Sequence, residues 1–460
     1  MSPTFRSLHV RNYRVYATGS LISNIGTWMQ TTAQAWLVLV LTDSGTALGL
    51  TVALQLLPTL LLSPVGGVLA DRFSKRTVLR VMQVMMAVPA AVLGTLAVTG
   101  VVATWHVFVL AFVFGIGRAL EAPARQSFVP EMVGRENLGN AVALNSASVN
   151  SGRLIGPAVA GVLIAALGGG VEGTGWVILL NAASYAASFI ALTMLDPERL
   201  TPSTVIASGP GAIRDGLRYV RSRPDLVLVL SCVLFVGGFG MNFQITSALM
   251  ATEEFGKGAR EYGVLGSILA VGSLAGALLA ARRAAPRLRF VVVSAFAFSL
   301  VQVASGLMPT YITYMAVLPL VGLSILTMAT TANAMIQMTS TPAMRGRVAA
   351  LYVMVFIGSV PFCAPLVGWV AEALGPRTAL VSTGVLAGLG IAAVTAWYVH
   401  QTEGETDHLR REAAALRSVY ARRTHLRGQP GDRGRLRLPQ RLREHRAVGS
   451  RDDRDPTSVR

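Results

Sequence analysis

The sequence predicts an all-α integral membrane protein whose twelve transmembrane helices form two six-helix bundles. Twelve apolar stretches lie between residues 13 and 400, each of about 20 residues, which is the length that crosses a bilayer. Apolar residues make up 52% of the chain and charged residues only 14%, against about a quarter in soluble domains. Positive charge is concentrated in alternate connections, as expected for loops held on one side of a membrane.

The spans divide into six and six around one long connection. In chain order we expect them at 15–42, 47–70, 77–99, 104–123, 140–168, 175–195, 225–251, 261–281, 289–308, 311–333, 348–374 and 376–400. The connection contains Asp196-Pro197 and Ser208-Gly209-Pro210-Gly211, which break regular structure. We therefore predict an N-terminal bundle at 1–195, a linker at 196–224, a C-terminal bundle at 225–400 and a tail at 401–460. Arginines at helical spacing predict a short amphipathic helix over 213–220 of the linker.

The distribution of Lys and Arg sets the orientation of the chain. Twenty of these residues lie in the N-terminal segment and in the connections after even-numbered spans, whereas the other connections hold Lys257, Arg260 and Arg377. This asymmetry predicts that both termini lie in the cytoplasm, and we expect the protein in the inner or plasma membrane of the cell. It also explains much of the net charge of +17, which in a soluble protein would suggest nucleic-acid binding. We expect no nucleic-acid partner.

Residues 401–460 differ from the spans in composition. They contain 15 Arg and no Lys, and no helical or strand period continues beyond about residue 420. We predict a disordered basic cytoplasmic tail, with one helix over 405–422. Two interpretations stand: the arginines bind anionic lipid at the bilayer surface, or the tail is solvated and inert.

The two halves of the chain resemble each other. Small residues and prolines recur at an offset of 207 or 208 residues, as in Pro157 and Pro365, and in Gly161 and Gly368. A same-hand repeat of six spans predicts two bundles related by an axis along the membrane normal, with a solute site near the midplane between them.

The connection between the second and third spans carries a long charged motif. It reads Gly66-Gly67-Val68-Leu69-Ala70-Asp71-Arg72-Phe73-Ser74-Lys75-Arg76. This stretch resembles the loop motif of the major facilitator superfamily, G-x-L-A-D-R-x-G-R-[RK], with Ser74 in place of the inner glycine. The resemblance implies that Asp71, with Gly67, Arg72, Lys75 and Arg76, gates the cytoplasmic side. The alternative is that Asp71 is an ordinary residue at a helix end.

The fifth span contains a second motif, Gly152-Arg153-Leu154-Ile155-Gly156-Pro157-Ala158-Val159-Ala160-Gly161. Gly152 and Gly156 make a face for close helix packing, and Pro157 leaves a backbone carbonyl to be satisfied elsewhere. The stretch resembles the antiporter motif of the same superfamily, G-x-x-x-G-P-x-x-G-G, with Ala160 in place of one glycine. The resemblance implies export.

Arg153 lies about 13 residues into the fifth span, near the expected centre of the bilayer. Insertion of a charge there costs about 2.5–3.5 kcal/mol, so the side chain must face the bundle interior or water. It either attracts an anion in the transport path or bonds to backbone loosened by Pro157.

Amides and hydroxyls recur inside the predicted spans. The first span has a stripe at spacings of three and four residues, formed by Asn24, Thr27, Gln30, Thr31 and Gln34. Such side chains face one another or water. We expect the stripe to line a substrate cavity together with Arg153 and with amides of other spans, namely Asn145, Asn242 and Asn333; the alternative for each is interhelical bonding.

Arg118 and Glu121 lie three residues apart in the fourth span and can share a helix face. They form either a local ion pair or, because the superfamily often links an arginine of this helix to proton movement, part of the coupling machinery. Asp71 is the third coupling candidate.

Segments in the first and fourth spans resemble one branch of the superfamily, which contains the enterobactin exporter and macrolide efflux proteins. The segments are Ser23-Asn24-Ile25-Gly26-Thr27-Trp28-Met29-Gln30 and Pro123-Ala124-Arg125-Gln126. The resemblance implies proton-driven export of a small molecule by alternating access.

The alternatives are an importer or facilitator of the same fold and a non-transporting membrane sensor. No nucleophile–base pair or phosphate-binding loop indicates an enzyme, and Cys232 and Cys363 lie inside spans, where neither a disulfide nor a metal site is indicated. We expect no cofactor beyond the proton gradient, and no feature indicates an oligomeric state.

Overall fold

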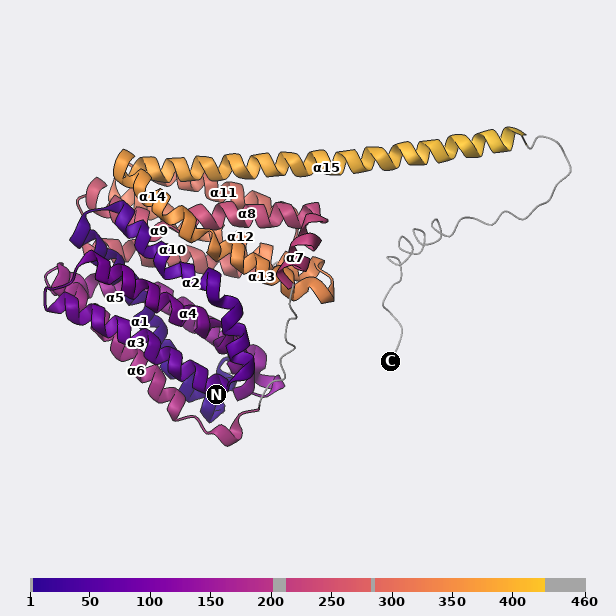
Figure 1. Cartoon of the computed structure of the whole chain (residues 1–460). Coiled ribbons are helices and arrows are strands. Elements are labelled where there is room, and N and C mark those ends of the chain that lie inside the picture. Colours follow the sequence, from indigo (N-terminus) through magenta and orange to yellow (C-terminus); the bar gives the residue numbers. More distant parts are fainter. Residues whose placement is uncertain (1–2, 202–211, 283–285, 427–460) are drawn as a thin grey trace. The chain divides into compact units, whose positions relative to one another are not determined.

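The computed structural model describes residues 3–201, 212–282 and 286–426, and within these ranges every regular element is a helix (Figure 1). The all-α prediction is therefore confirmed. The chain divides into two units, Met1–Val399 and His400–Arg460.

Six long helices make up the first half, after a short 3-10 helix at Pro3–His9. Ser44 and Ser74 precede α2 and α3, and each side-chain hydroxyl accepts a hydrogen bond from the backbone amide three residues on, which caps the helix. The six helices are α1 (Arg11–Thr42), α2 (Gly45–Arg72), α3 (Lys75–Val98), α4 (Thr104–Met132), α5 (Arg135–Ala166) and α6 (Val171–Thr193).

The second half contains more helices because two predicted spans are interrupted. After a 3-10 turn at Pro197–Arg199, the linker helix α7 spans Ala212–Arg221, as expected from its arginine spacing. The helices that follow are α8 (Pro224–Gly240), α9 (Phe243–Leu249), a π-helical turn (Met250–Glu254), α10 (Ala259–Ala281), α11 (Leu288–Gly306), α12 (Tyr311–Thr339), α13 (Pro342–Gly358), α14 (Val360–Leu374) and α15 (Pro376–Leu426).

The two interruptions fall inside the predicted spans 225–251 and 348–374, while the stretches Pro224–Glu254 and Pro342–Leu374 are each long and apolar enough to cross a membrane. Between α8 and α9 the helix is broken at Met241 and Asn242, directly after a glycine-rich stretch with low helix propensity. Between α13 and α14 the break lies at Ser359, where Pro361 lacks the backbone amide that would continue the hydrogen-bond ladder.

Eleven stretches of the described chain are long and apolar enough to cross a membrane, and the chain is a multi-pass membrane protein. α1 is not among the eleven, although its 32 residues extend about 48 Å at 1.5 Å per residue. The polar side chains of Asn24, Gln30 and Gln34 lower its hydropathy.

The two halves meet mainly along two helix pairs, α2 with α14 and α5 with α10. In the first pair, a Cβ atom on Gly49 would lie 2.3 Å from the carbonyl oxygen of Ala364, and one on Gly368 would lie 2.1 Å from that of Gly45. Only glycine permits such backbone contact.

The second pair repeats this arrangement. A Cβ atom on Gly263 of α10 would lie 2.3 Å from the carbonyl oxygen of Pro157, and one on Gly161 would lie 2.5 Å from that of Ala259. α2 and α10 begin at this end of the molecule, and α5 and α14 finish there. We call it the glycine-packed end, defined by Gly45, Gly49, Gly161, Gly263 and Gly368.

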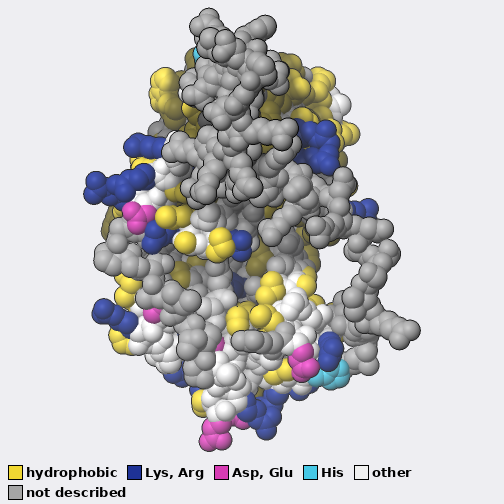
Figure 2. All heavy atoms as spheres, turned by 90° about the vertical axis from the view of Figure 1, so that its right-hand side faces the viewer, with side chains coloured by type: hydrophobic (Ala, Val, Ile, Leu, Met, Phe, Trp, Pro, Cys, Tyr) yellow, Lys and Arg dark blue, Asp and Glu magenta, His cyan; other side chains and the backbone are white. Residues whose placement is uncertain are grey.

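The opposite end is defined by the connections at residues 72–76, 133–135 and 340–347, and we call it the arginine-rich end. Three of its glycines face open space, since a Cβ atom on Gly67, Gly139 or Gly346 would meet no atom within 4 Å, and Gly66 packs against α4 of its own half. Figure 2 looks onto this end and shows Lys and Arg side chains around a hollowed centre. The structure is thus closed at one end and open at the other.

The last helix is longer than the predicted span. α15 continues to Leu426, so residues 401–426 are helical where we expected disorder around a helix at 405–422. Residues 427–460, the rest of the predicted tail, lie outside the described part of the chain.

Candidate transport site

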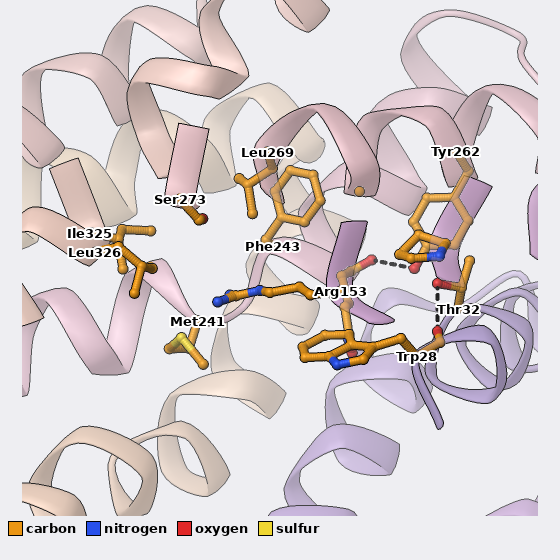
Figure 3. Close-up of a pocket in the computed structure, with 14 residues that line it drawn as sticks. Trp28, Thr32, Arg153, Met241, Phe243, Tyr262, Leu269, Ser273, Ile325 and Leu326 are labelled. Atoms are coloured by element: carbon orange, nitrogen blue, oxygen red, sulfur yellow. Dashed lines mark hydrogen bonds between the residues drawn. The ribbon is translucent and has the colours of Figure 1, made fainter. Parts of the chain in front are cut away.

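A pocket lies where the two halves meet (Figure 3). Its empty volume is about 680 Å³, part of which is open to solvent. α1 and α5 from the first half, and the α8–α9 break, α10 and α12 from the second, all contribute to its walls. The larger side chains around it are Trp28, Arg153, Phe243, Tyr262, Leu269 and Leu326.

Arg153 is the one charged residue among those that line the pocket. Its guanidinium carbon lies 5.3 Å from the centre of the Trp28 ring, within the range of a cation–π interaction. Within the described residues it forms no hydrogen bond or ion pair, including with the backbone around Pro157. Figure 3 shows the guanidinium pointing toward Met241 and Leu326 and away from Tyr262. Its five N–H donors are therefore available to a bound molecule.

The glycine motif of α5 places Arg153 at this position. A Cβ atom on Gly152 would lie 2.8 Å from the backbone of Asn24, and one on Gly156 would lie 2.6 Å from Cβ of Trp28. These contacts press α5 against α1, so the indole of Trp28 lies beside the guanidinium. Pro157 and Gly161, from the other part of the motif, contact α10.

The break between α8 and α9 supplies the pocket wall from the second half. Met241, Phe243 and Gln244 line the pocket at or beside the break. Asn242 does not, because it is 1% exposed and its amide nitrogen donates to the carbonyl of Gly238 at 2.5 Å. Its Oδ1 has no hydrogen-bond partner.

The polar stripe of α1 faces helices of its own half. Gln30 Oε1 accepts a hydrogen bond of 2.5 Å from Asn181 of α6. The hydroxyls of Thr27 and Tyr185 lie 2.9 Å apart. Thr27 and Gln30 therefore form hydrogen bonds between helices, which is the alternative interpretation. This corrects the expectation that they line the substrate cavity.

Thr31 and Gln34 of the stripe do not line the pocket either. Thr31 donates to the carbonyl of Thr27, and Gln34 is 3% exposed with both side-chain polar atoms unpartnered. α1 reaches the pocket with Trp28 and Thr32 instead.

Two further amides expected in the cavity lie outside the pocket lining. Asn333 accepts a hydrogen bond of 3.1 Å from Gln337 in its own helix. Asn145 is half-buried on α5, eight residues before Arg153.

In the charged motif between α2 and α3, two cations are bonded to neighbouring helices, and the carboxylate of Asp71 bonds to no described residue. Lys75 is buried and paired with Glu131 of α4, while Arg76 donates to the backbone carbonyls of Leu192 and Thr193 at the end of α6. Both cations therefore fix the loop to its own half. Asp71 is exposed and forms no hydrogen bond or ion pair in the described part of the chain.

Glu121 pairs with a different arginine from the one expected. Its carboxylate lies 3.7 Å from Arg125, one turn further along α4, and this corrects the predicted pairing with Arg118. Arg125 also donates to Ser20 and Asn24 of α1, at 2.7 and 2.8 Å. Since Asn24 donates to Ser148 of α5 at 2.8 Å, a continuous network connects α4, α1 and α5.

A narrow polar cavity surrounds this network inside the first half. Gln83 of α3 donates to Glu121 at 3.2 Å, and Tyr16 of α1 lines the same cavity. Arg118 is half-buried and forms no hydrogen bond or ion pair with a described residue. α4 extends to Met132 rather than to residue 123, so Glu121 lies about 16 Å from its end at 1.5 Å per residue.

A family model described as transmembrane secretion effector matches residues 2–423. The chain belongs to this family of the major facilitator superfamily. It is 27% identical over 394 residues to the multidrug efflux pump Tap of Mycolicibacterium fortuitum, with 82% of this chain and 93% of Tap covered. It is 26% identical over 326 residues to the enterobactin exporter EntS of Shigella boydii, with 70% and 76% covered.

The fold is shared with solved structures. A bacterial homologue of the human lysosomal transporter Spinster, in an inward-facing and unoccupied conformation, has a TM-score of 0.66 at 13% identity. The likeness covers 87% of this chain and 98% of the homologue. The expected membership of the superfamily is confirmed.

Several pocket residues of this transporter escaped prediction from sequence. Trp28, Phe243 and Tyr262 are apolar or amphipathic, so they match the general composition of a membrane helix. The signal that could have found the second-half wall is the run Gly237-Gly238-Phe239-Gly240, because helices of transporters are interrupted at binding sites near the midplane.

Proposed function

We propose that this chain is a proton-driven exporter of a small amphiphilic molecule, such as a drug, siderophore or metabolite, that works by alternating access. The pocket with Arg153 is its substrate site. The observation that carries the proposal is the position of this pocket, whose walls come from both halves and which lies between a closed and an open end. The names of Tap and EntS, both exporters, support the direction.

The proposal includes twelve spans in two six-helix bundles. α1 is the twelfth span, because its length suffices and its polar side chains are buried against other helices. The bundles comprise 1–195 and 225–400, joined by a linker at 196–224. The arginine-rich end lies in the cytoplasm, with both termini, and the glycine-packed end lies outside the cell. The structure then represents an inward-open state in the cell membrane.

Glu121 is our candidate for the proton-binding carboxylate, with Arg118 beside it on α4 and Asp71 as part of the gate. Protonation of Glu121 removes the counter-charge of Arg125, which must then find other partners. Because Arg125 holds α1 at Ser20 and Asn24, and Asn24 holds α5 at Ser148, its rearrangement reaches the helix that carries Arg153.

The function is tested with everted membrane vesicles that contain the full chain. We expect accumulation of an amphiphilic substrate from a chemically diverse panel when a proton gradient is imposed, and its loss when the gradient is collapsed. Accumulation only in right-side-out vesicles would favour the importer. Absence of movement in both orientations across the panel would contradict a transport function.

The coupling assignment is tested with Glu121→Gln. We expect substrate exchange down a gradient to persist and uphill accumulation to fall at least tenfold. Glu131→Gln is the matched control, because this carboxylate is buried in the same helix but paired with Lys75. It should lower thermal stability without uncoupling. Normal uphill transport in Glu121→Gln would remove the assignment.

A further inference from the structure

The substrate pocket contains hydrogen-bonding groups that the protein itself does not use. Arg153 has no ionic or hydrogen-bonded partner among the described residues. Ser273 of α10 is 2% exposed, and its hydroxyl has no partner. The side-chain amide of Gln244, beside the α8–α9 break, also bonds to no described residue. All three line one pocket, whose lining contains no carboxylate.

The remaining walls are apolar and partly flat. The indole of Trp28 lies beside the guanidinium, and Phe243, Leu269 and Leu326 add apolar surface. In Figure 3 the end of Arg153 extends into the space flanked by Met241, Ser273 and Leu326. A ligand in this space meets a charged donor at one point and hydrocarbon elsewhere.

The sign of the charge decides between classes of ligand. A guanidinium without a counter-ion in a low-dielectric pocket is stabilised by an anion and repelled by a cation. A carboxylate or sulfonate can take two parallel N–H donors of an arginine. We infer that this site binds amphiphiles with one anionic head group and a flat aromatic body, and that it excludes permanent cations.

In this arrangement the head group contacts Arg153, with Gln244 as an additional donor, and the aromatic body lies against Trp28 and Phe243. The inference names the substrate class of the proposed transporter and so rests on that function. The inference is tested by equilibrium binding, which needs no proton gradient. A protein that does not transport would therefore fail the vesicle assay but could still bind the probes, so failure of the proposed function and failure of this inference can be told apart.

The experiment uses three probes with one fluorescent body: 1-pyrenebutyrate, its methyl ester and the corresponding quaternary ammonium compound. Binding to the full-length protein in nanodiscs is measured against empty nanodiscs. We expect the acid to bind at least tenfold more tightly than the ester and the cation to bind weakest. In Arg153→Gln the difference between acid and ester should fall below threefold, and Arg153→Lys should restore part of it.

Arg289→Gln is the matched control variant. The guanidinium of Arg289 on α11 lies 5.1 Å from the centre of the Phe290 ring, a distance similar to that between Arg153 and Trp28, and it lies outside the pocket lining. It should leave all three affinities unchanged. Equal binding of acid and ester to the wild-type protein, an unchanged difference in Arg153→Gln, or binding of none of the probes would each overturn the inference.

Discussion

The two ends of the interface between the halves differ in the kind of contact they make. At the glycine-packed end, backbone lies against backbone in two equivalent helix pairs, α2–α14 and α5–α10. At the arginine-rich end Gly67, Gly139 and Gly346 face open space, and Lys and Arg side chains are exposed around it (Figure 2). Close packing is strong but intolerant of added atoms, whereas contacts between exposed charges are weak and easily reversed.

Polar contacts also join the halves near the closed end. The backbone amide of Ala158 on α5 donates to the Ser267 hydroxyl of α10 at 3.2 Å. Glu372 near the end of α14 accepts hydrogen bonds from the Ser44 hydroxyl and the Thr46 amide at the start of α2, at 2.7 and 2.9 Å. The carboxylate thus caps the α2 helix of the other half. The open end has no such fastening in the described residues, since Asp71 is unpaired while Lys75 and Arg76 bond within their own half.

The largest effect is expected from Gly368→Val. The new side chain would collide with the backbone of Gly45, where even a Cβ atom would lie 2.1 Å from the carbonyl oxygen. Such overpacking typically costs about 1–3 kcal/mol or more. We expect a lower melting temperature and loss of efflux, measured by thermal unfolding in detergent and by vesicle transport.

Gly67→Val is the paired substitution at the open end. A Cβ atom at this position meets no atom within 4 Å in this conformation, so we expect the melting temperature to stay unchanged. Efflux should nevertheless fall, because the arginine-rich end must close during the cycle. Equal melting temperatures for the two variants would contradict the contrast between the ends.

Asp71→Asn is expected to reduce export at least tenfold while the amount of inserted protein stays normal. The side chain is exposed and unpaired here, so its charge is required in the state where this end is closed. Glu136→Gln is the control, since Glu136 is an exposed carboxylate at the same end, 3.8 Å from Arg6. Near-normal export in Asp71→Asn would remove the gating role.

Glu372→Ala should have a smaller effect, and it should favour opening of the glycine-packed end, whereas Gly67→Val keeps the arginine-rich end open. The contact is largely exposed, so its loss is worth no more than about 1 kcal/mol, roughly a fivefold shift toward opening of the glycine-packed end. The measurement is the thiol-labelling rate of a cysteine introduced at Thr46. Glu261→Ala, which removes a cap within its own half at Gly258, should not change that rate.

The smallest effect is expected from deletion of residues 405–460. Both ends of the interface belong to the unit Met1–Val399, so export from vesicles should be unchanged. A large loss of transport would show that the tail takes part in the cycle and would support the membrane-sensor alternative.

The order of the helices could be predicted from sequence because bilayer thickness fixes span length and loop charge fixes their alternation. The interruptions after Gly240 and at Ser359 were missed, since apolar composition continues through both. For α1, spacing located the polar face correctly but could not say whether it meets the pocket or other helices. Glu121 was assigned to Arg118 because three- and four-residue spacings are both compatible with one helix face, and the structure selects Arg125.

Alternating access is tested most directly by spin-label distances at both ends of one molecule. Labels at Val101 and Leu307 report the glycine-packed end, and labels at Glu198 and Met338 report the arginine-rich end; all four positions are exposed. Cys232 and Cys363 are first replaced by alanine. We expect two distance populations at each end. Gly67→Val should increase the population with the short distance between Val101 and Leu307, and the population with the long distance between Glu198 and Met338. A single distance at both pairs, unaffected by Gly67→Val and Glu372→Ala, would contradict the account.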